Sequence, residues 1–197
     1  MEYKIVRLIY PYKSNNKISV SKVPAKNKTI YNTVDFFEQE LSPRIKLINK
    51  KTKNKIQLRD IINLHNDTGI QDLARIKVMV SQIKSGKHVL SPRDLPNIKL
   101  VKTKNNEWVL FDGHHSMLAY MFAGKRYLNE IPHLIVENEQ GYVADKEILV
   151  FFGEHSKKIK NWRRYVINWQ AQKEKQLCRR RQNNMGELFK AIKKDLF

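Results

Sequence analysis

The sequence has only one cysteine, Cys178, among 197 residues. A single cysteine cannot form an internal disulfide, and it excludes a zinc site built from several thiolates. Acidic residues are also scarce, since 19 of them stand against 38 lysines and arginines, a net charge of +19. The longest apolar run, residues 148–152, is far shorter than the ~20 residues of a membrane span, and no apolar secretory segment follows Met1. We therefore expect a cytoplasmic protein with no membrane span and an anionic partner.

The positive charge is concentrated at the two ends of the chain. Residues 1–55 contain 13 lysines and arginines and 4 acidic residues, and residues 156–197 contain 13 and 3. Residues 56–155 contain 12 of each. We therefore divide the chain into a basic N-terminal segment (1–55), a neutral central domain (56–155) and a basic tail (156–197). This segregation favours contact of both ends with nucleic-acid phosphates; an anionic membrane surface and ordinary solvated lysines are the alternatives.

Hydrophobic residues make up 41% of the chain, enough to form a core, and their spacing predicts elements in the N-terminal segment. Alternation predicts a strand over residues 3–10, ended by Pro11, and helical spacing predicts a short helix over residues 33–41. Residues 45–48 and 56–58 read as two strands joined by a polar loop. The pattern leaves open whether this segment joins the central sheet or forms a separate lobe.

The central domain alternates helices and strands. A helix is predicted with Thr68 as its N-cap and Gly86 just after its end, followed by a hairpin of strands 98–103 and 108–111. A second helix begins at His114 and stops at Gly124, and strands are predicted over residues 132–136 and 148–152. The predicted fold class is α/β (α+β) with a mixed sheet and interleaved helices, because both hairpins and crossovers are present.

The tail is predicted to be helical. Ile159, Trp162, Val166 and Trp169 repeat at the spacing of one helical face, which favours an apolar seam over base-stacking platforms. Residues 183–186 break this helix, and a short terminal helix follows. The side chains predicted to bind nucleic acid are the clustered cations of the tail: Lys157, Lys158, Lys160, Arg163, Arg164, Arg179, Arg180 and Arg181.

The turn after the strand at residues 108–111 carries the most chemistry. Asp112 and Gly113 precede a helix whose first residues are His114, His115 and Ser116. The first turn of a helix offers backbone N–H groups and the positive end of the macrodipole, and glycine permits close backbone approach. We refer to Gly113, His114, His115 and Ser116 as the 113–116 turn and expect this turn to bind phosphate. The alternative is structural: His114 caps the helix and His115 donates to a nearby carbonyl.

The order of motifs over residues 56–137 resembles the ParB/sulfiredoxin superfamily (the ParB-like N-terminal domain). The matching elements are Leu58-Arg59-Asp60-Ile61, Ile83-Lys84-Ser85-Gly86, Ile98-Lys99-Leu100-Val101, Asp112-Gly113-His114-His115-Ser116, Gly124, and Pro132-His133-Leu134-Ile135-Val136. The resemblance implies that the turn binds nucleotide phosphates through Gly113, His114, His115 and Ser116. The cofactor would be a nucleoside triphosphate, such as CTP or ATP, or ADP, with Mg²⁺.

The sequence departs from this family at three points. Ser116 stands where the family has an arginine, which removes a bidentate phosphate contact. The turn lacks the cysteine of sulfiredoxins, so reduction of sulfinic acid is not expected. The loop at residues 63–67 lacks the glutamate of the free-serine kinases and has His65 and Asp67 instead.

Two other functions remain open at this stage. A phosphotransferase, similar to the free-serine kinases, or a nuclease would use Asp112 and His115 as catalytic residues. A non-enzymatic interaction module would retain only the fold. No metal site is expected, because adjacent histidines on a helix point about 100° apart and seldom share one metal. The sequence does not predict the oligomeric state.

Overall fold

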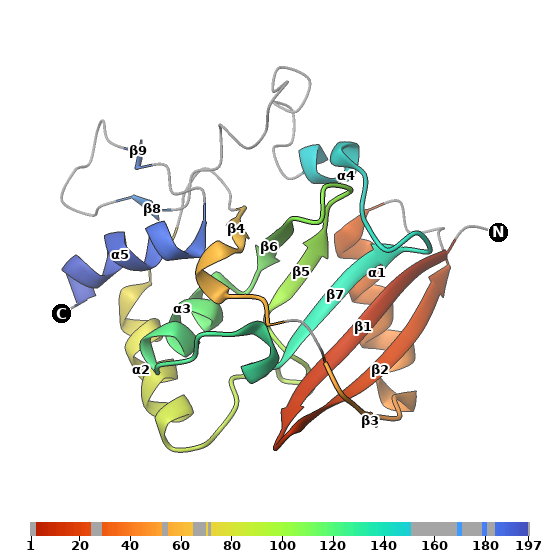
Figure 1. Ribbon diagram of the computed structural model, residues 1–197, viewed down its shortest axis with the longest axis horizontal. Coiled ribbons are helices and arrows are strands. Elements are labelled where there is room, and N and C mark those ends of the chain that lie inside the picture. The colour runs from red at the N-terminus through yellow and green to blue at the C-terminus, as the bar shows by residue number, and fades with distance from the viewer. Residues whose placement is uncertain are drawn as a thin grey trace.

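The computed structural model describes residues 3–24, 29–52, 55–64, 70, 72–150, 169–170, 179–180 and 184–196. Its main feature is a seven-stranded sheet in the order β3-β2-β1-β7-β5-β6-β4 (Figure 1). β5 runs parallel to β7 and β4 parallel to β6, whereas the other neighbours are antiparallel. The predicted α/β class with a mixed sheet is confirmed.

The bounds of the elements are as follows. The strands of the sheet are β1 (Tyr3–Tyr12), β2 (Asn15–Pro24), β3 (Ile48–Lys50), β4 (Ile62–Asn63), β5 (Lys99–Lys102), β6 (Trp108–Asp112) and β7 (His133–Asn138). The helices of the described residues are α1 (Ile30–Phe36), which continues as a π-helical turn η1 (Phe37–Leu41), α2 (Leu73–Lys84), α3 (His114–Phe122), α4 (Asp145–Leu149) and α5 (Met185–Leu196).

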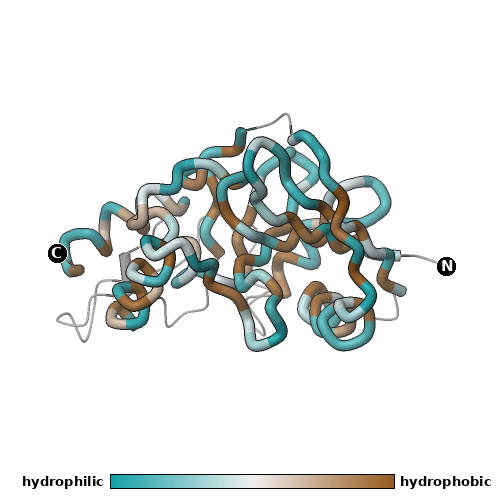
Figure 2. Tube along the Cα trace, turned by 90° about the horizontal axis from the view of Figure 1, so that it is seen from below, coloured by the Kyte–Doolittle hydropathy of each residue, from teal (hydrophilic) through white to brown (hydrophobic). Residues whose placement is uncertain are grey.

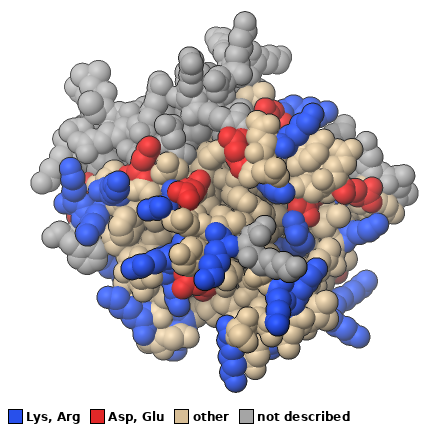
Figure 3. Space-filling model, in the orientation of Figure 1, with Lys and Arg blue, Asp and Glu red and all other residues tan. Residues whose placement is uncertain are grey.

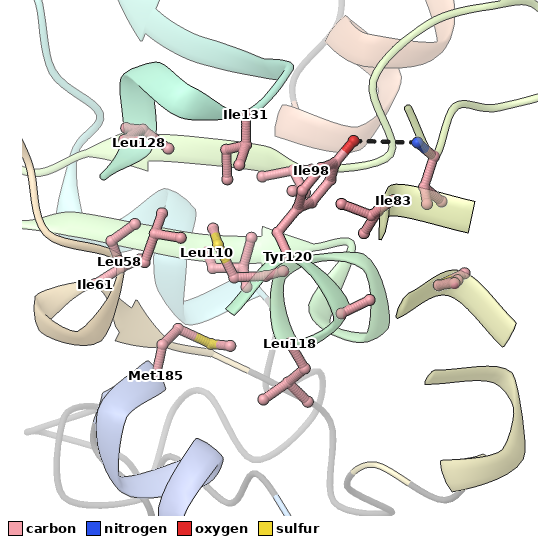
Figure 4. Close-up of a cluster of buried hydrophobic side chains, with 14 of the residues drawn as sticks. Leu58, Ile61, Ile83, Ile98, Leu110, Leu118, Tyr120, Leu128, Ile131 and Met185 are labelled. Atoms are coloured by element: carbon pink, nitrogen blue, oxygen red, sulfur yellow. Dashed lines mark hydrogen bonds between the residues drawn. The ribbon is translucent and has the colours of Figure 1, made fainter. Parts of the chain in front are cut away.

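The sheet separates two hydrophobic clusters. Residues of α2, α3 and α5 form one cluster with Leu100, Leu110 and Ile135 of the sheet. Residues of α1, η1 and α4 form the other with Val101, Val109 and Val136. Helices thus cover both faces, and Figure 2 shows that the most hydrophobic segments lie inside this arrangement. Figure 4 shows the first cluster, in which the hydroxyl of Tyr120 accepts a hydrogen bond from the backbone N–H of Val89 at 3.1 Å.

The N-terminal segment joins the central sheet. β1 pairs with β7 on one side and with β2 on the other, so its residues are central in the sheet. The predicted strand at residues 3–10 is confirmed, but it does not end at Pro11. Pairing with β7 ends at Ile9, so Pro11 has only β2 as a neighbour, a position that tolerates proline. The strand β2 was missed by the sequence prediction.

Three strand predictions, over residues 45–48, 56–58 and 148–152, differ from the described structure. Ile48 belongs to β3, which pairs with β2, and residues Leu58–Asp60 form a 3₁₀ turn rather than a partner strand. The second apolar segment packs locally, because the N–H of Leu58 donates to the carbonyl of Arg126 and its side chain is buried. Residues Asp145–Leu149 form helix α4 instead of entering a strand at residue 148, and Glu147 accepts a hydrogen bond from the N–H of Ala144. A bond from the side chain of the third helical residue to the N–H of the N-cap is one half of a capping box and is typical of a helix start.

The predicted helix that ends before Gly86 is present as α2. α2 begins at Leu73, and its N-cap is Asp72, which accepts a hydrogen bond from the N–H of Arg75 at 2.9 Å. Thr68 was the predicted N-cap and lies outside the described residues. The N-cap of α2 is Asp72 instead. Gly86 has a φ of +84° directly after α2, as predicted for a residue that ends a helix in the left-handed region.

The prediction of a helix from residue 157 is wrong for residues 169–170 and 179–180, the part of that segment that the structure describes. Residues Trp169–Gln170 (β8) and Arg179–Arg180 (β9) form a small antiparallel pair. A continuous helix would separate Trp169 from Arg180 by about 16 Å along its axis, whereas here they are strand partners. The spacing of the apolar residues is a local signal, and pairing with the segment at residues 179–180 overrides it. The terminal helix α5 is confirmed, and its Phe189 ring packs on Phe122 of α3 at a centroid distance of 4.4 Å.

No helix of the described residues has both the length and the hydrophobicity needed to cross a membrane.

Candidate anion-binding site at the start of helix α3

The strand-to-helix turn at Gly113 is held tightly against a neighbouring backbone segment. Gly113 has a φ of +87°, in the left-handed region that favours glycine. A Cβ at this position would collide with the carbonyl oxygen of Asn97 and would lie 2.7 Å from the Cα of Ile98. The first hydrogen bond of α3 joins the N–H of Met117 to the carbonyl of Gly113. Only glycine therefore allows α3 to start at this place.

Asp112 stabilises the turn through both carboxylate oxygens. Its Oδ1 accepts a hydrogen bond from the N–H of Gly113 at 2.8 Å, and its Oδ2 lies 2.9 Å from Nζ of Lys99. The same Nζ lies 3.3 Å from Oε1 of Glu38 in η1. Burial opposes the charge of Lys99, but Asp112 and Glu38 outweigh this effect and raise its pKa. The ion pair with Lys99 thus holds the carboxylate of Asp112 in place. The described contacts of Asp112 stabilise the fold of the turn.

A residue of the N-terminal segment also contacts this turn. The hydroxyl of Tyr31 in α1 donates to the carbonyl of Phe111 at 3.4 Å, and the two rings pack edge to face with centroids 5.6 Å apart. Burial, with the nearby charge of Asp112, raises the pKa of Tyr31 to about 12. The tyrosine therefore stays protonated and keeps its donor at neutral pH.

The predicted phosphate-binding side chains differ in their exposure. His114 and Ser116 are buried, with 4% and 2% of their surface exposed, whereas His115 is partly exposed. The hydroxyl of Ser116 lies 3.9 Å from the sulfur of Met79 in α2. Ser116 therefore packs between helices, and any contact it makes with a ligand would come from its backbone. His115 is the more exposed of the two residues, and the Nε2 atom of each is buried.

The structure adds Asn63 to the candidate site. The carboxyl ends of parallel strands meet at one edge of a sheet, and Asn63 at the end of β4 is the register partner of Leu110 in β6. Ile62 and Leu64 pack in the cluster with α1, so alternation places Asn63 on the opposite face, where Leu110 and α3 lie. Asn63 is 0% exposed, and neither its Oδ1 nor its Nδ2 has a hydrogen-bond partner among the described residues. The sequence signal was a single amide inside the apolar run at residues 61–64.

An open depression of about 580 Å³ lies between η1 with the residues after it and the segment at residues 93–95. It is lined by Glu38, Gln39, Ser42, Pro43, Arg93 and Leu95. Lys99 connects it to the turn, because its ammonium group contacts both Glu38 and Asp112. The depression is polar and has charges of both signs on its walls.

Of the remaining predicted residues, the structure describes the backbone of two. Arg179 and Arg180 lie in β9, while Lys157, Lys158, Lys160, Arg163, Arg164 and Arg181 fall outside the described residues. His65 and Asp67 also fall outside them. Within the described ranges, no three His, Cys, Asp or Glu residues are grouped as metal ligands would be.

No family model, curated protein or solved structure matches this chain.

Proposed function

We propose that this protein binds the phosphates of a nucleotide at the 113–116 turn and binds nucleic acid through its basic ends, on a ParB-like fold. The single observation that carries the first part is the buried amide of Asn63. A buried polar side chain without partners costs about 1–3 kcal/mol, so a protein retains one where a ligand or another group completes its hydrogen bonds. Asn63 pairs in register with Leu110 of β6, three residues before Gly113, and lies on the face of the sheet that α3 covers.

The position of the turn supports an anionic ligand. The start of α3 carries the positive end of the helix dipole, which stabilises negative charge. Ligands of open α/β sheets commonly bind outside the carboxyl ends of strands, and β4 and β6 both end here. The amide of Asn63 provides both a donor and an acceptor for such a ligand.

A thermal unfolding experiment tests the nucleotide part. The purified chain is unfolded with CTP, ATP, ADP and GTP, each with and without Mg²⁺. A nucleotide present at 100 times its Kd should stabilise the protein by about 2.7 kcal/mol, which for a chain of this size raises Tm by several degrees. In Asn63→Leu this increase should disappear. If no nucleotide raises the Tm of the wild-type chain, the nucleotide part of the proposal is wrong.

The charge distribution supports the nucleic-acid part. Residues 156–197 carry a net charge of +10, and each lysine or arginine that neutralises a phosphate of duplex DNA adds about 0.9 to the log–log salt slope. Replacing Arg179, Arg180 and Arg181 by glutamine should reduce this slope by two to three. The matched control replaces three exposed lysines of the central domain, Lys84, Lys87 and Lys104, and should leave the slope nearly unchanged. Equal effects of the two triple variants would show that only total charge matters.

A further inference from the structure

The tip of the β1–β2 hairpin presents an exposed tyrosine among lysines. The side chain of Tyr12 is 45% exposed, and Nζ of Lys17 lies 4.4 Å from the centre of its ring. Nζ of Lys13 lies 5.8 Å from the same centre. Lys50 of β3 is the register partner of Asn16, and Lys51 follows it. We call these five residues (Tyr12, Lys13, Lys17, Lys50 and Lys51) the hairpin tip.

The positive charge of the hairpin tip is not compensated by neighbouring carboxylates. Farther along the same hairpin, Lys4 pairs with Glu147, Arg7 with Glu137, and Lys22 with Glu139. Among the described residues, no ion pair joins any of the four tip lysines to a carboxylate. The hairpin therefore has a neutralised end and a cationic end. Figure 3 shows lysine and arginine side chains along the lower edge of the molecule, where β1 and β2 meet in Figure 1.

The sequence keeps this region free of acidic residues. Neither residues 3–34 nor residues 41–59 contain an aspartate or a glutamate, whereas the second range contains seven lysines and arginines. The carboxylates that neutralise the other end of the hairpin come from β7, the turn after it, and α4. These carboxylates thus come from residues 137–147. Among the described residues, none of them pairs with a lysine of the tip.

We propose that the hairpin tip binds single-stranded nucleic acid, with one base stacked on Tyr12 and the adjacent phosphates on the lysines. This inference rests on the nucleic-acid part of the proposed function, and it adds the surface and the strandedness of the ligand. An unpaired base exposes the aromatic face that stacking on tyrosine requires, and a duplex hides it. The lysines bind phosphates without reading sequence, so the tip binds with little base preference.

A base can replace Lys17 on the ring of Tyr12. A lysine over an exposed tyrosine is a weak interaction of about 0.5–1 kcal/mol, so a base displaces Lys17 from the ring at small cost. The displaced ammonium group then lies within one side-chain length of the phosphates that flank the stacked base. Ser14, Asn15 and Asn16 complete the turn with polar side chains, and Ile48 of the neighbouring strand β3 is 63% exposed.

The test measures fluorescence anisotropy of a labelled 20-nucleotide oligo-dT with the full-length chain. Tyr12→Ala should weaken binding about tenfold through loss of stacking, while Tyr12→Phe retains the wild-type affinity. The double variant Lys13→Gln/Lys17→Gln should lower the log–log salt slope by about 1.4, the value for two contacts to a single strand. Its matched control, Lys84→Gln/Lys87→Gln, lies on and after α2 and should bind as the wild type does.

The outcomes separate this inference from the proposed function. If the tip variants bind as the wild type while the variant lacking Arg179–Arg181 loses affinity, the tip inference is wrong and the proposed function stands. If the wild-type chain binds no oligonucleotide, the nucleic-acid part of the proposed function fails and the tip inference fails with it. If Tyr12→Ala instead reduces binding to phosphatidylserine vesicles and leaves oligo-dT binding unchanged, the partner is a membrane surface and the inference is overturned.

Discussion

The carbonyl oxygen of Asn97 occupies the space that a Cβ at position 113 would need. Residue 113 therefore has to be glycine for β6 to turn into α3 beside the segment that leads into β5. This contact places the start of α3 directly after β6, whose Leu110 is the register partner of Asn63 at the end of β4. The geometry of the candidate site thus depends on a backbone-to-backbone contact and only secondarily on side-chain chemistry.

Replacing Gly113 by alanine should be more destabilising than replacing the other glycine of the same helix. A left-handed backbone costs an alanine about 1–2 kcal/mol, and the clash with Asn97 and Ile98 should add about 1–3 kcal/mol. Gly124 has a φ of +91° but nothing within 4 Å of its Cβ position, so Gly124→Ala should show only the backbone cost. Chemical denaturation measures both. Equal losses of stability in the two variants would contradict the close approach at Gly113.

Asn63→Leu should stabilise the protein in the absence of nucleotide. Leucine has nearly the same shape and removes an amide that has no described partner, so the free energy of unfolding should rise by about 1–3 kcal/mol. Asn16→Leu is the matched control, because Asn16 is also buried but its Nδ2 donates to Oγ1 of Thr52 at 3.4 Å. That variant should be destabilised. A loss of stability in Asn63→Leu would show that the amide already has its partners in the free protein.

Stability should fall between pH 6.5 and pH 4 because of His133. Burial lowers its pKa to about 4, with a smaller contribution from Arg7, although Nδ1 donates to the carbonyl of Ile131 at 2.8 Å. The neutral form is favoured in the folded state, so its stabilisation is complete above pH 6.5 and is lost as the pH falls toward the folded pKa. By pH 5 the loss should be about 2 kcal/mol. His133→Gln should flatten this part of the curve of unfolding free energy against pH, and an unchanged slope in that variant would assign the effect to other groups.

Helix α5 should be required for the stability of the central core. The N–H of Met185 donates to the carbonyl of Ile61 at 2.8 Å, and Leu188 is fully buried. Leu188→Ala should therefore cost about 2–5 kcal/mol. Lys193→Ala, on the exposed side of the same helix, should cost less than about 0.5 kcal/mol. If the two variants unfold at the same denaturant concentration, α5 does not pack on the core in solution.

The sequence predicted those elements whose signals are local. Gly86, Gly113 and Gly124 mark helix boundaries through backbone conformation alone, and all three have the expected positive φ. The hairpin of β5 and β6 was predicted in the same way, from two apolar runs around a polar turn. The turn at Gly113 was therefore predictable before its surroundings were known.

The failures involve pairing between separate segments of the chain. The segment at residues 48–50 pairs with β2, and Trp169 pairs opposite Arg180; neither partnership follows from the spacing of apolar residues nearby. Asn63 was missed as a site residue for the same reason. Its position opposite Leu110 depends on the parallel pairing of β4 with β6, which joins segments more than forty residues apart. The contact of Tyr31 with Phe111 likewise required knowledge of which helix covers the sheet.

The central claim is that a nucleotide binds at the start of α3, and an NMR titration tests it most directly. Amide ¹⁵N–¹H spectra of the full-length chain are recorded with increasing CTP, ATP or ADP in the presence of Mg²⁺. We predict that the largest shifts occur at the backbone amides of residues 113–116 and at the side-chain amide of Asn63. Saturable shifts confined to other residues, or no shifts at millimolar nucleotide, would contradict the proposed site.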